Sequence, residues 1–338
     1  MAISSKELAR LLHISPSTVS MVLNNKPGIS KETRAKVLQA AEENGYDFSR
    51  RRENKSATAT IFLIIYKKHG AVVGDTPFFA QVIEGIESAC RRHNCVLQIR
   101  YFYEHENFSA QIDPLNNSDC LGFLLLGTEM NEEDFQPFSA VDAPLVVLDC
   151  YYDKLAYDTV LMNNVQGAYL ATDYLITQGH TKIGYLHSSI ATSNFSERAD
   201  GYYKALRHYH IPTSHPYVFS VRPTTDGALE DMTACLAEKP ALPTCFFADN
   251  DIIAAACMRA LMEHGFRIPE DISVVGFDNI PVCELMSPPL TTMNVPKHYL
   301  GSMAVERLMD RKKHSYEHCA KLELSTSLII RESVRKLC

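Results

Sequence analysis

Near its N-terminus the chain reads Ser15-Pro16-Ser17-Thr18-Val19-Ser20-Met21-Val22-Leu23-Asn24. Ser15 is a good helix cap, and Pro16 suits the first helical position, where its missing N–H costs nothing. Val19, Val22 and Leu23 fall on one side of a helix, and the other side carries small polar groups. The stretch therefore predicts a short helix with one apolar face and one small, polar face.

The flanking residues add a helix on each side of this one. Upstream, Ser4 and Glu7 fit a capping box, and Leu8, Leu11 and Leu12 form an apolar stripe. Downstream, the loop Asn25-Lys26-Pro27-Gly28 precedes a helix that Ser30 caps and that ends at Gly45. Helix, tight turn and short capped helix make the helix-turn-helix plan, whose second helix enters a major groove. The alternative is a helical hairpin that packs on the body and binds nothing.

The charge distribution favours the DNA-binding alternative. Residues 1–60 carry ten basic and six acidic side chains, a net charge of +4. The other 278 residues carry 23 basic and 34 acidic side chains, a net charge of −11, so the total of −7 hides a basic head. A basic terminal module indicates a polyanionic partner. The 46% of hydrophobic and 22% of charged residues are typical of a globular protein and exclude disorder, collagen and coiled coil as the main class.

From residue 61 onward, apolar strands alternate with amphipathic helices. We expect strands at 61–66, 95–102, 120–127, 145–150, 182–187, 217–221, 244–248 and 272–277. Helices are expected at 79–93, 165–178, 196–208, 227–238 and 252–264. Continuous apolar strands separated by helices predict parallel sheets covered on both faces, and so many strands predict two α/β subdomains. A ligand would bind between them, at the carboxyl ends of the strands.

Other features narrow the class of protein further. The ten cysteines are scattered from Cys90 to Cys338 without a CxxC pair, which is typical of reduced thiols in a long chain. No apolar run approaches the length of about 18 residues that a membrane helix needs, so we expect a cytoplasmic protein. P-loop, GxSxG, HExxH and GxGxxG motifs are all missing, so we expect neither a catalytic site nor a metal or cofactor.

The head resembles the DNA-binding domain of the LacI family of bacterial transcription regulators. The stretch from Ser15 to Asn24, then Ser30-Lys31-Glu32-Thr33-Arg34 and Val37-Leu38, ending in Gly45-Tyr46, follows the family pattern VS-x-x-TVS-R-VLN, VS-x-x-T-R, VL…GY. The resemblance implies that Pro16, Ser17 and Met21 read bases. It implies that phosphates are held by Ser15, Thr18, Ser20, Asn24, Ser30 and Thr33.

Three departures from the family pattern bear on this DNA contact. Met21 stands where Arg is usual, and Met cannot make the bidentate pair with guanine that is worth about 1–3 kcal/mol. His13 replaces the usual Gly of the turn. The linker, residues 47–60, lacks the Pro-Asn pair of the usual hinge helix and the Leu that this helix inserts into the minor groove, so we expect no such insertion here. Its Arg50-Arg51-Arg52 run either tracks DNA phosphates or is a solvated charge run.

The body continues the same resemblance. Its motifs at 77–79, 85–86, 144–149, 179–183, 198–201, 250–251, 269–279 and 289–292 match those of the family's periplasmic-binding-protein-like effector domain. Two matches are imperfect, since Thr76 replaces the usual Asn and Asn163-Asn164 stands where Asp-Asn is common.

The resemblance also implies the residues of the effector pocket. Asp149, Arg198, Asn250 and Asp278 are the expected polar contacts, and Phe78 or Phe79 is the expected wall. Carboxylates, Arg and Asn suit the vicinal hydroxyls of a sugar, and an aromatic ring covers its apolar face. Each residue has another interpretation: the two Asp residues could cap loops, Arg198 could be a surface charge and Asn250 a turn residue.

We therefore expect a small all-α helix-turn-helix domain at 1–46, a linker at 47–60, and a body at 61–338. The body is expected to be α/β, with two doubly wound parallel-sheet subdomains. The function implied is a DNA-binding regulator, most simply a repressor of an operator, controlled by a small effector. A sugar is the expected effector class, with a nucleoside or purine open, and the assembly expected is a homodimer formed through the body. The rival functions are a sugar- or nucleoside-binding protein without a genetic role and a hydrolase acting in the cleft.

Overall fold

A computed structural model describes residues 5–23, 29–44, 46, 59–74, 77–116, 118, 120–213, 217–314 and 317–337. The chain divides into two compact units, Met1–Thr58 and Ala59–Cys338. Several sequence predictions lie outside the described residues: the cap at Ser4, the contact at Asn24, the loop at 25–28, the helix end at Gly45, the linker over residues 47–58, and the motif position Thr76.

The first unit holds the three predicted helices, α1 (Ser5–Leu11), α2 (Pro16–Leu23) and α3 (Lys31–Glu43). Leu8, Val19 and Val37 meet in its small apolar core. Ser15 caps α2, because its hydroxyl accepts a hydrogen bond from the Thr18 N–H at 3.0 Å. His13 has a φ of 53°, so this residue takes the left-handed conformation that Gly usually supplies in such a turn.

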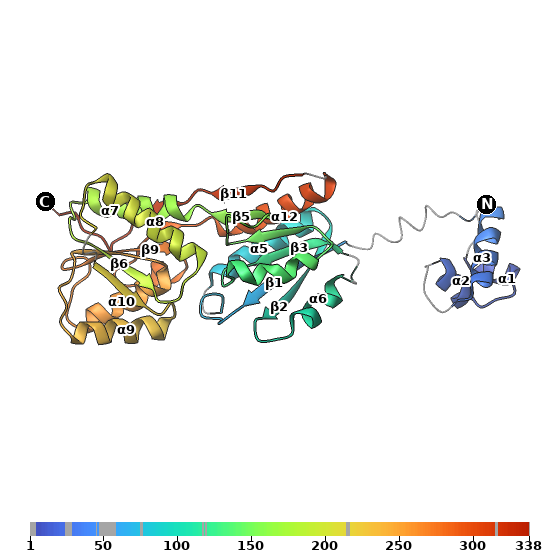
Figure 1. Ribbon diagram of the computed structural model, residues 1–338, viewed down its shortest axis with the longest axis horizontal. Coiled ribbons are helices and arrows are strands. Elements are labelled where there is room, and N and C mark those ends of the chain that lie inside the picture. Colours follow the sequence, from blue (N-terminus) through green and yellow to red (C-terminus); the bar gives the residue numbers. More distant parts are fainter. Residues whose placement is uncertain are drawn as a thin grey trace. The chain divides into compact units, whose positions relative to one another are not determined.

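The second unit contains two six-stranded sheets (Figure 1). Sheet A has the order β11-β5-β4-β3-β1-β2 and is parallel throughout. Its strands are β1 (Ala59–Lys67), β2 (Cys95–Tyr103), β3 (Cys120–Leu126), β4 (Leu145–Leu148), β5 (Asp158–Met162) and β11 (Lys321–Leu324). Alternate β1 side chains face opposite layers, with Ile61 and Leu63 toward α5 (Phe78–Arg92) and α12 (Lys297–Lys313). Phe62 and Ile64 face α6 (Phe108–Asn116) and the 3₁₀ helix η1 (Glu132–Ala140).

Sheet B has the order β12-β10-β9-β8-β6-β7. Its strands are β6 (Ile183–Ser188), β7 (Tyr217–Val221), β8 (Cys245–Ala248), β9 (Ser273–Asp278), β10 (Thr291–Asn294) and β12 (Ser327–Ile329). Helices α7 (Asn164–Thr177) and α8 (Ser193–His208) cover one face (Figure 1). Helices α9 (Thr225–Ala237) and α10 (Asp251–Glu263) cover the other, and the short α11 (Val282–Leu285) follows β9. The prediction of two parallel-sheet subdomains is confirmed, with β12 as an antiparallel edge strand.

Four strands were not predicted from the sequence: β5, β10, β11 and β12. The Thr-Thr-Met-Asn sequence of β10 is short and largely polar, yet the strand is largely buried. Its polar side chains are satisfied internally, since the Thr292 hydroxyl donates to the Asp251 carboxylate at 2.6 Å. Tertiary hydrogen bonding thus allows this short polar segment to be buried.

The chain crosses between the two sheets three times, at the connections β5–α7, β10–α12 and β11–β12. Two of these connections, β5–α7 and β11–β12, are tied to each other, because the Asn163 N–H donates to the Leu324 carbonyl at 2.9 Å. The Gln166 carboxamide also accepts hydrogen bonds from the backbone and hydroxyl of Thr326. These ties fix where the carboxyl ends of the two sheets face each other.

Candidate functional site

A cavity of about 30 Å³ lies between the carboxyl ends of the two sheets. This is room for one or two water molecules. All six predicted effector residues line it: Phe78, Phe79, Asp149, Arg198, Asn250 and Asp278. The structure therefore brings these six residues together around one cavity, and their contact with an effector stays a prediction. Six further lining residues were not predicted: Val72, Thr128, Met162, Thr192, Asn194 and Phe195.

Asp149 follows β4 and has one carboxylate oxygen without a partner among the described residues. Its Oδ2 accepts a hydrogen bond of 2.6 Å from the Thr128 hydroxyl, whereas its buried Oδ1 has no hydrogen-bond donor in that part of the chain. Burial raises the pKa of Asp149 to about 7. A buried acceptor without a partner costs free energy unless a ligand or water satisfies it. Oδ1 is therefore the atom of this cavity that most needs a donor from a ligand.

Arg198 lies on α8 and is only 3% exposed, so it is not the surface charge that the sequence left as an alternative. Its Nε donates to the Asn164 Oδ1 at 2.9 Å, and its Nη2 donates to the Asp278 Oδ1 at 3.3 Å. A further bond runs from Nη1 to the Asp249 carbonyl. The guanidinium also stacks on the Phe277 ring, with its carbon 3.8 Å from the ring centroid. These contacts fix its position at the cavity wall.

Asp278 ends β9 with a φ of 108°, and a buried lysine holds the turn that follows. The Lys297 ammonium donates to the carbonyls of Asp278 at 2.5 Å, Asn279 at 3.1 Å and Val295 at 3.3 Å. Burial raises the pKa of Asp278, and the charges of Arg198 and Lys297 oppose that rise. Sequence reasoning missed Lys297, because a lysine in the first turn of a helix is ordinarily exposed.

Asn250 combines the two interpretations that the sequence left open. Its Oδ1 caps α10 by accepting a hydrogen bond from the Ile253 N–H at 2.9 Å. The residue also lines the cavity, and no described residue accepts a hydrogen bond from its Nδ2. The cap therefore occupies the side-chain oxygen and leaves the amide nitrogen for a ligand.

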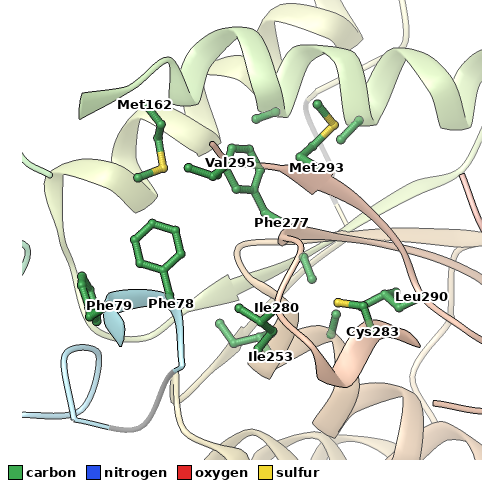
Figure 2. Packing of buried hydrophobic residues seen from close by; sticks show 14 of the residues in the cluster. Phe78, Phe79, Met162, Ile253, Phe277, Ile280, Cys283, Leu290, Met293 and Val295 are labelled. Atoms are coloured by element: carbon green, nitrogen blue, oxygen red, sulfur yellow. The ribbon is translucent and has the colours of Figure 1, made fainter. Parts of the chain in front are cut away.

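The apolar wall comes from the start of α5. The rings of Phe78 and Phe79 are both buried, and their centroids lie 5.1 Å apart in an edge-to-face arrangement. Figure 2 shows Phe78 and Met162 close to each other, from two different elements. Phe195 of α8 adds a third ring to the lining. The wall thus offers flat apolar surface beside the carboxylates and the guanidinium.

One asparagine, Asn194, connects the subdomains across the cavity, and a second, Asn164, holds it in place. The Asn194 Nδ2 donates to the Asp149 carbonyl at 2.9 Å, and the Asn164 Nδ2 donates to the Asn194 Oδ1 at 3.0 Å. The neighbouring Asn163 caps α7 through its side-chain oxygen, at 2.8 Å from the Gln166 nitrogen. Asp would cap equally well, which explains why the change from the usual Asp-Asn pair leaves the local structure intact.

In the head, the predicted DNA-contacting residues line the outer side of α2 and the start of α3. Exposed members of this set are Ser15, Pro16, Ser17, Ser20 and Ser30, and half-buried ones are Thr18, Met21 and Thr33. Ser30 caps α3, since its hydroxyl accepts from the Thr33 N–H at 3.2 Å. The face that α2 turns away from its core is free of bulky apolar side chains apart from Met21, as a helix entering a major groove requires.

No group of three or more His, Cys, Asp or Glu in the described part of the chain is arranged to hold a metal ion. Among the helices of the described residues, none combines the length and apolarity needed to cross a membrane.

Comparison with known families places a match at each end of the chain. The family described as "Bacterial regulatory proteins, lacI family" matches residues 5–48, and the "Periplasmic binding protein-like domain" matches residues 172–334. The chain is 32% identical to the ribose operon repressor of Haemophilus influenzae over 98% of both chains. It is 30% identical to the HTH-type transcriptional repressor PurR of Aliivibrio salmonicida, over 98% of this chain and 99% of that one.

Comparison with solved structures also finds transcription regulators with the same fold. A complex of the transcriptional regulator CelR with cellobiose has a TM-score of 0.74 at 25% identity, covering 98% of this chain and 99% of that one. A LacI family regulator from Enterococcus faecium with bound ribose has a TM-score of 0.71 at 27% identity, covering 82% of this chain and 100% of that one. The lac repressor dimer bound to operator shares the fold, with a TM-score of 0.73 at 21% identity over 99% and 100% of the two chains.

Proposed function

Because the chain belongs to the LacI family of bacterial regulatory proteins, we propose that it is an operator-binding repressor controlled by a small ligand. The ligand binds in the cavity between sheets A and B, and the helix-turn-helix head contacts DNA. The observation that carries the ligand site is the buried Asp149 Oδ1, which has no hydrogen-bond donor among the described residues. In the same cavity, the Asn250 Nδ2 offers a donor and Asp278 offers a second acceptor.

The ligand is a compact polyhydroxylated molecule, and D-ribose is the first candidate. Two carboxylates, a guanidinium and a carboxamide around a small apolar wall suit vicinal hydroxyl groups on a small ring. Two similar proteins support this choice, since one is a ribose operon repressor and the other is a regulator with bound ribose. A purine is the second candidate, because the aromatic wall of Phe78, Phe79 and Phe195 also suits a flat heterocycle. Either ligand requires the subdomains to separate, since about 30 Å³ holds only one or two waters.

The DNA contact follows from the head. Pro16, Ser17 and Met21 read base edges, and the hydroxyl and amide groups of Ser15, Thr18, Ser20, Asn24, Ser30 and Thr33 hold phosphates. Met21 contacts a thymine methyl group rather than a guanine. The operator therefore differs from those that relatives with Arg at this position bind.

The chain acts as a homodimer through its body, in the cytoplasm and without catalysing a reaction. Two heads on one dimer match a two-fold symmetric operator. Support for the dimer comes from Leu285 and Tyr299, large apolar side chains that are 84% and 54% exposed in the isolated chain.

Thermal-shift measurements with D-ribose and with hypoxanthine test the ligand class. At about 100 times its Kd, a ligand adds about 2.7 kcal/mol to the free energy of unfolding, so the correct one raises Tm by several degrees. A shift with hypoxanthine alone would move the assignment to purines. Release of product from nitrophenyl glycosides would contradict the non-enzymatic assignment and favour a cleft hydrolase.

A further inference from the structure

The loop that follows β1 forms one wall of the ligand cavity. Val72 lines the cavity, and the loop leads into α5 with its two phenylalanines. Gly70 has a φ of 71°, and a Cβ atom at Gly74 would lie 2.5 Å from the Gly70 carbonyl oxygen. The loop is therefore tightly turned, and its shape decides where Val72 stands.

A single buried carboxylate on sheet A holds this loop. The Glu129 side chain, in the turn after β3, has no exposed surface. Its Oε2 accepts hydrogen bonds from the backbone N–H groups of Lys68 (3.0 Å), His69 (3.2 Å) and Gly70 (2.8 Å). Its Oε1 accepts from those of Val72 and Val73, each at 2.9 Å. Five amides of one loop thus converge on one side chain.

The sixth amide in this run, that of Ala71, donates to the His69 Nδ1 at 3.1 Å. The same Nδ1 lies 3.4 Å from the Glu129 Oε1. All six successive N–H groups from 68 to 73 are therefore satisfied by side chains. The conformation of the loop depends on Glu129 more than on hydrogen bonds within the loop itself.

Glu129 is ionised, as a side chain that accepts five backbone hydrogen bonds should be. Burial raises the pKa of Glu129, but the backbone hydrogen bonds outweigh burial, so its pKa lies below the usual range and the group is ionised at neutral pH. The preceding residue, Thr128, orients Asp149 through the 2.6 Å hydrogen bond to Oδ2. One short turn after β3 thus positions both a ligand acceptor and a wall of the cavity.

We propose that Glu129 is a positioning residue of the ligand site, which fixes the 68–73 loop and with it the Val72 wall. The proposal rests on the proposed function in one respect, that the cavity takes a ligand. Glu129 itself makes no contact with that ligand.

Amide hydrogen exchange of the full-length protein without ligand tests the hold on the loop. Glu129→Gln keeps the size of the side chain but points an NH₂ group at amides that need an acceptor. We expect exchange at residues 68–73 to become faster by about tenfold or more, because hydrogen bonds to a charged group are among the strong ones. Glu133→Gln, at an exposed position nearby, is the matched control and should leave these rates unchanged. Unchanged exchange in Glu129→Gln would overturn the proposal.

Calorimetric titration with D-ribose, at a temperature well below Tm, tests whether the conformation of the 68–73 loop affects ligand affinity. We expect Glu129→Gln to raise the Kd about tenfold, and less in a Val72→Ala background, because both changes act on the same wall. If Glu129 has only a structural role, Glu129→Gln should weaken ribose binding equally in the wild-type and Val72→Ala backgrounds, or should speed exchange without changing the Kd. Either result overturns the proposal. If the wild type binds neither ribose nor hypoxanthine, the proposed function fails, and the exchange rates still decide whether Glu129 holds the loop.

Discussion

At the scale of single residues, the cavity is organised around polar groups that are buried and only partly satisfied. Among the described residues, Asp149 keeps one oxygen without a donor while Thr128 and Asn194 hold the residue in place. Such a group is destabilising in the unliganded protein, and a ligand that donates to it recovers that free energy. The cavity should therefore prefer a ligand that carries hydrogen-bond donors, such as hydroxyl groups.

At about pH 8, above the Asp149 pKa of about 7, Asp149→Asn should weaken ribose binding by about tenfold or more, because an ionised acceptor of ligand hydroxyls is replaced by a neutral amide. Calorimetric titration of the full-length protein measures this change. Asp153→Asn, at an exposed position, is the control and should bind as the wild type does. Equal affinities of Asp149→Asn and the wild type would remove Asp149 from the site.

The raised pKa of Asp149 also predicts how stability depends on pH. Its folded-state pKa of about 7 exceeds the usual value of 3.8, so its contribution is fully present below about pH 4 and lost as pH rises through 7. Asp251, also buried with a pKa raised to about 7, acts in the same direction. Urea unfolding between pH 4.5 and 7.5 should show a smaller loss of stability in Asp149→Asn than in the wild type. Parallel profiles would contradict the assignment.

Met21→Arg should change which operator the head prefers. Arg makes the bidentate pair with guanine that Met cannot, which favours a guanine at the contacted position by about 1–3 kcal/mol. Selection of binding sites from random DNA by the full-length protein measures this preference. Met21→Leu is the control, and identical selected sites for wild type and Met21→Arg would place Met21 away from the bases.

At the scale of elements, the sequence predicts those whose signal is local. Helices α2, α7 and α10 and strand β1 follow from caps and apolar periodicity, and the cap at Ser30 is confirmed by its bond to Thr33. Strand β10 does not, since its pairing with β9 and the bond from Thr292 to Asp251 join residues far apart in the chain. Likewise, no neighbouring sequence pattern predicts the roles of Glu129 and Lys297, because each binds backbone groups of another part of the chain.

The cap of α10 separates the two roles of Asn250. Asn250→Ala should lower the free energy of unfolding by about 1 kcal/mol through loss of the cap, whereas Asn250→Ser should retain most of it. Both substitutions remove Nδ2 and should weaken ribose binding. Denaturant unfolding combined with ribose titration measures the two effects. Normal ribose affinity in Asn250→Ser would leave Asn250 with a structural role only.

At the scale of the whole molecule, the cavity exists because the chain crosses three times between two sheets. The crossings bring Asp149 of one subdomain beside Arg198 and Asp278 of the other, although 129 positions separate the two aspartates in the sequence. The family resemblance predicted this set of residues. Without it, each residue could equally have had a structural role, such as a loop cap, a surface charge or a turn. Lys297 starts α12, which packs on sheet A, and binds carbonyls beyond β9 of sheet B, so it joins the two subdomains at the cavity.

The proposed function requires that ligand binding in this cavity changes the affinity of the head for DNA. Fluorescence anisotropy with full-length protein and DNA from its own promoter region, at fixed low salt, measures this affinity. Saturating D-ribose, or hypoxanthine if that is the ligand found, should change the operator Kd of the wild type by about 5–150-fold. The same ligand concentration should change it far less in Asp149→Asn. Ligand binding that leaves operator affinity unchanged, or no operator binding with or without ligand, would contradict the claim.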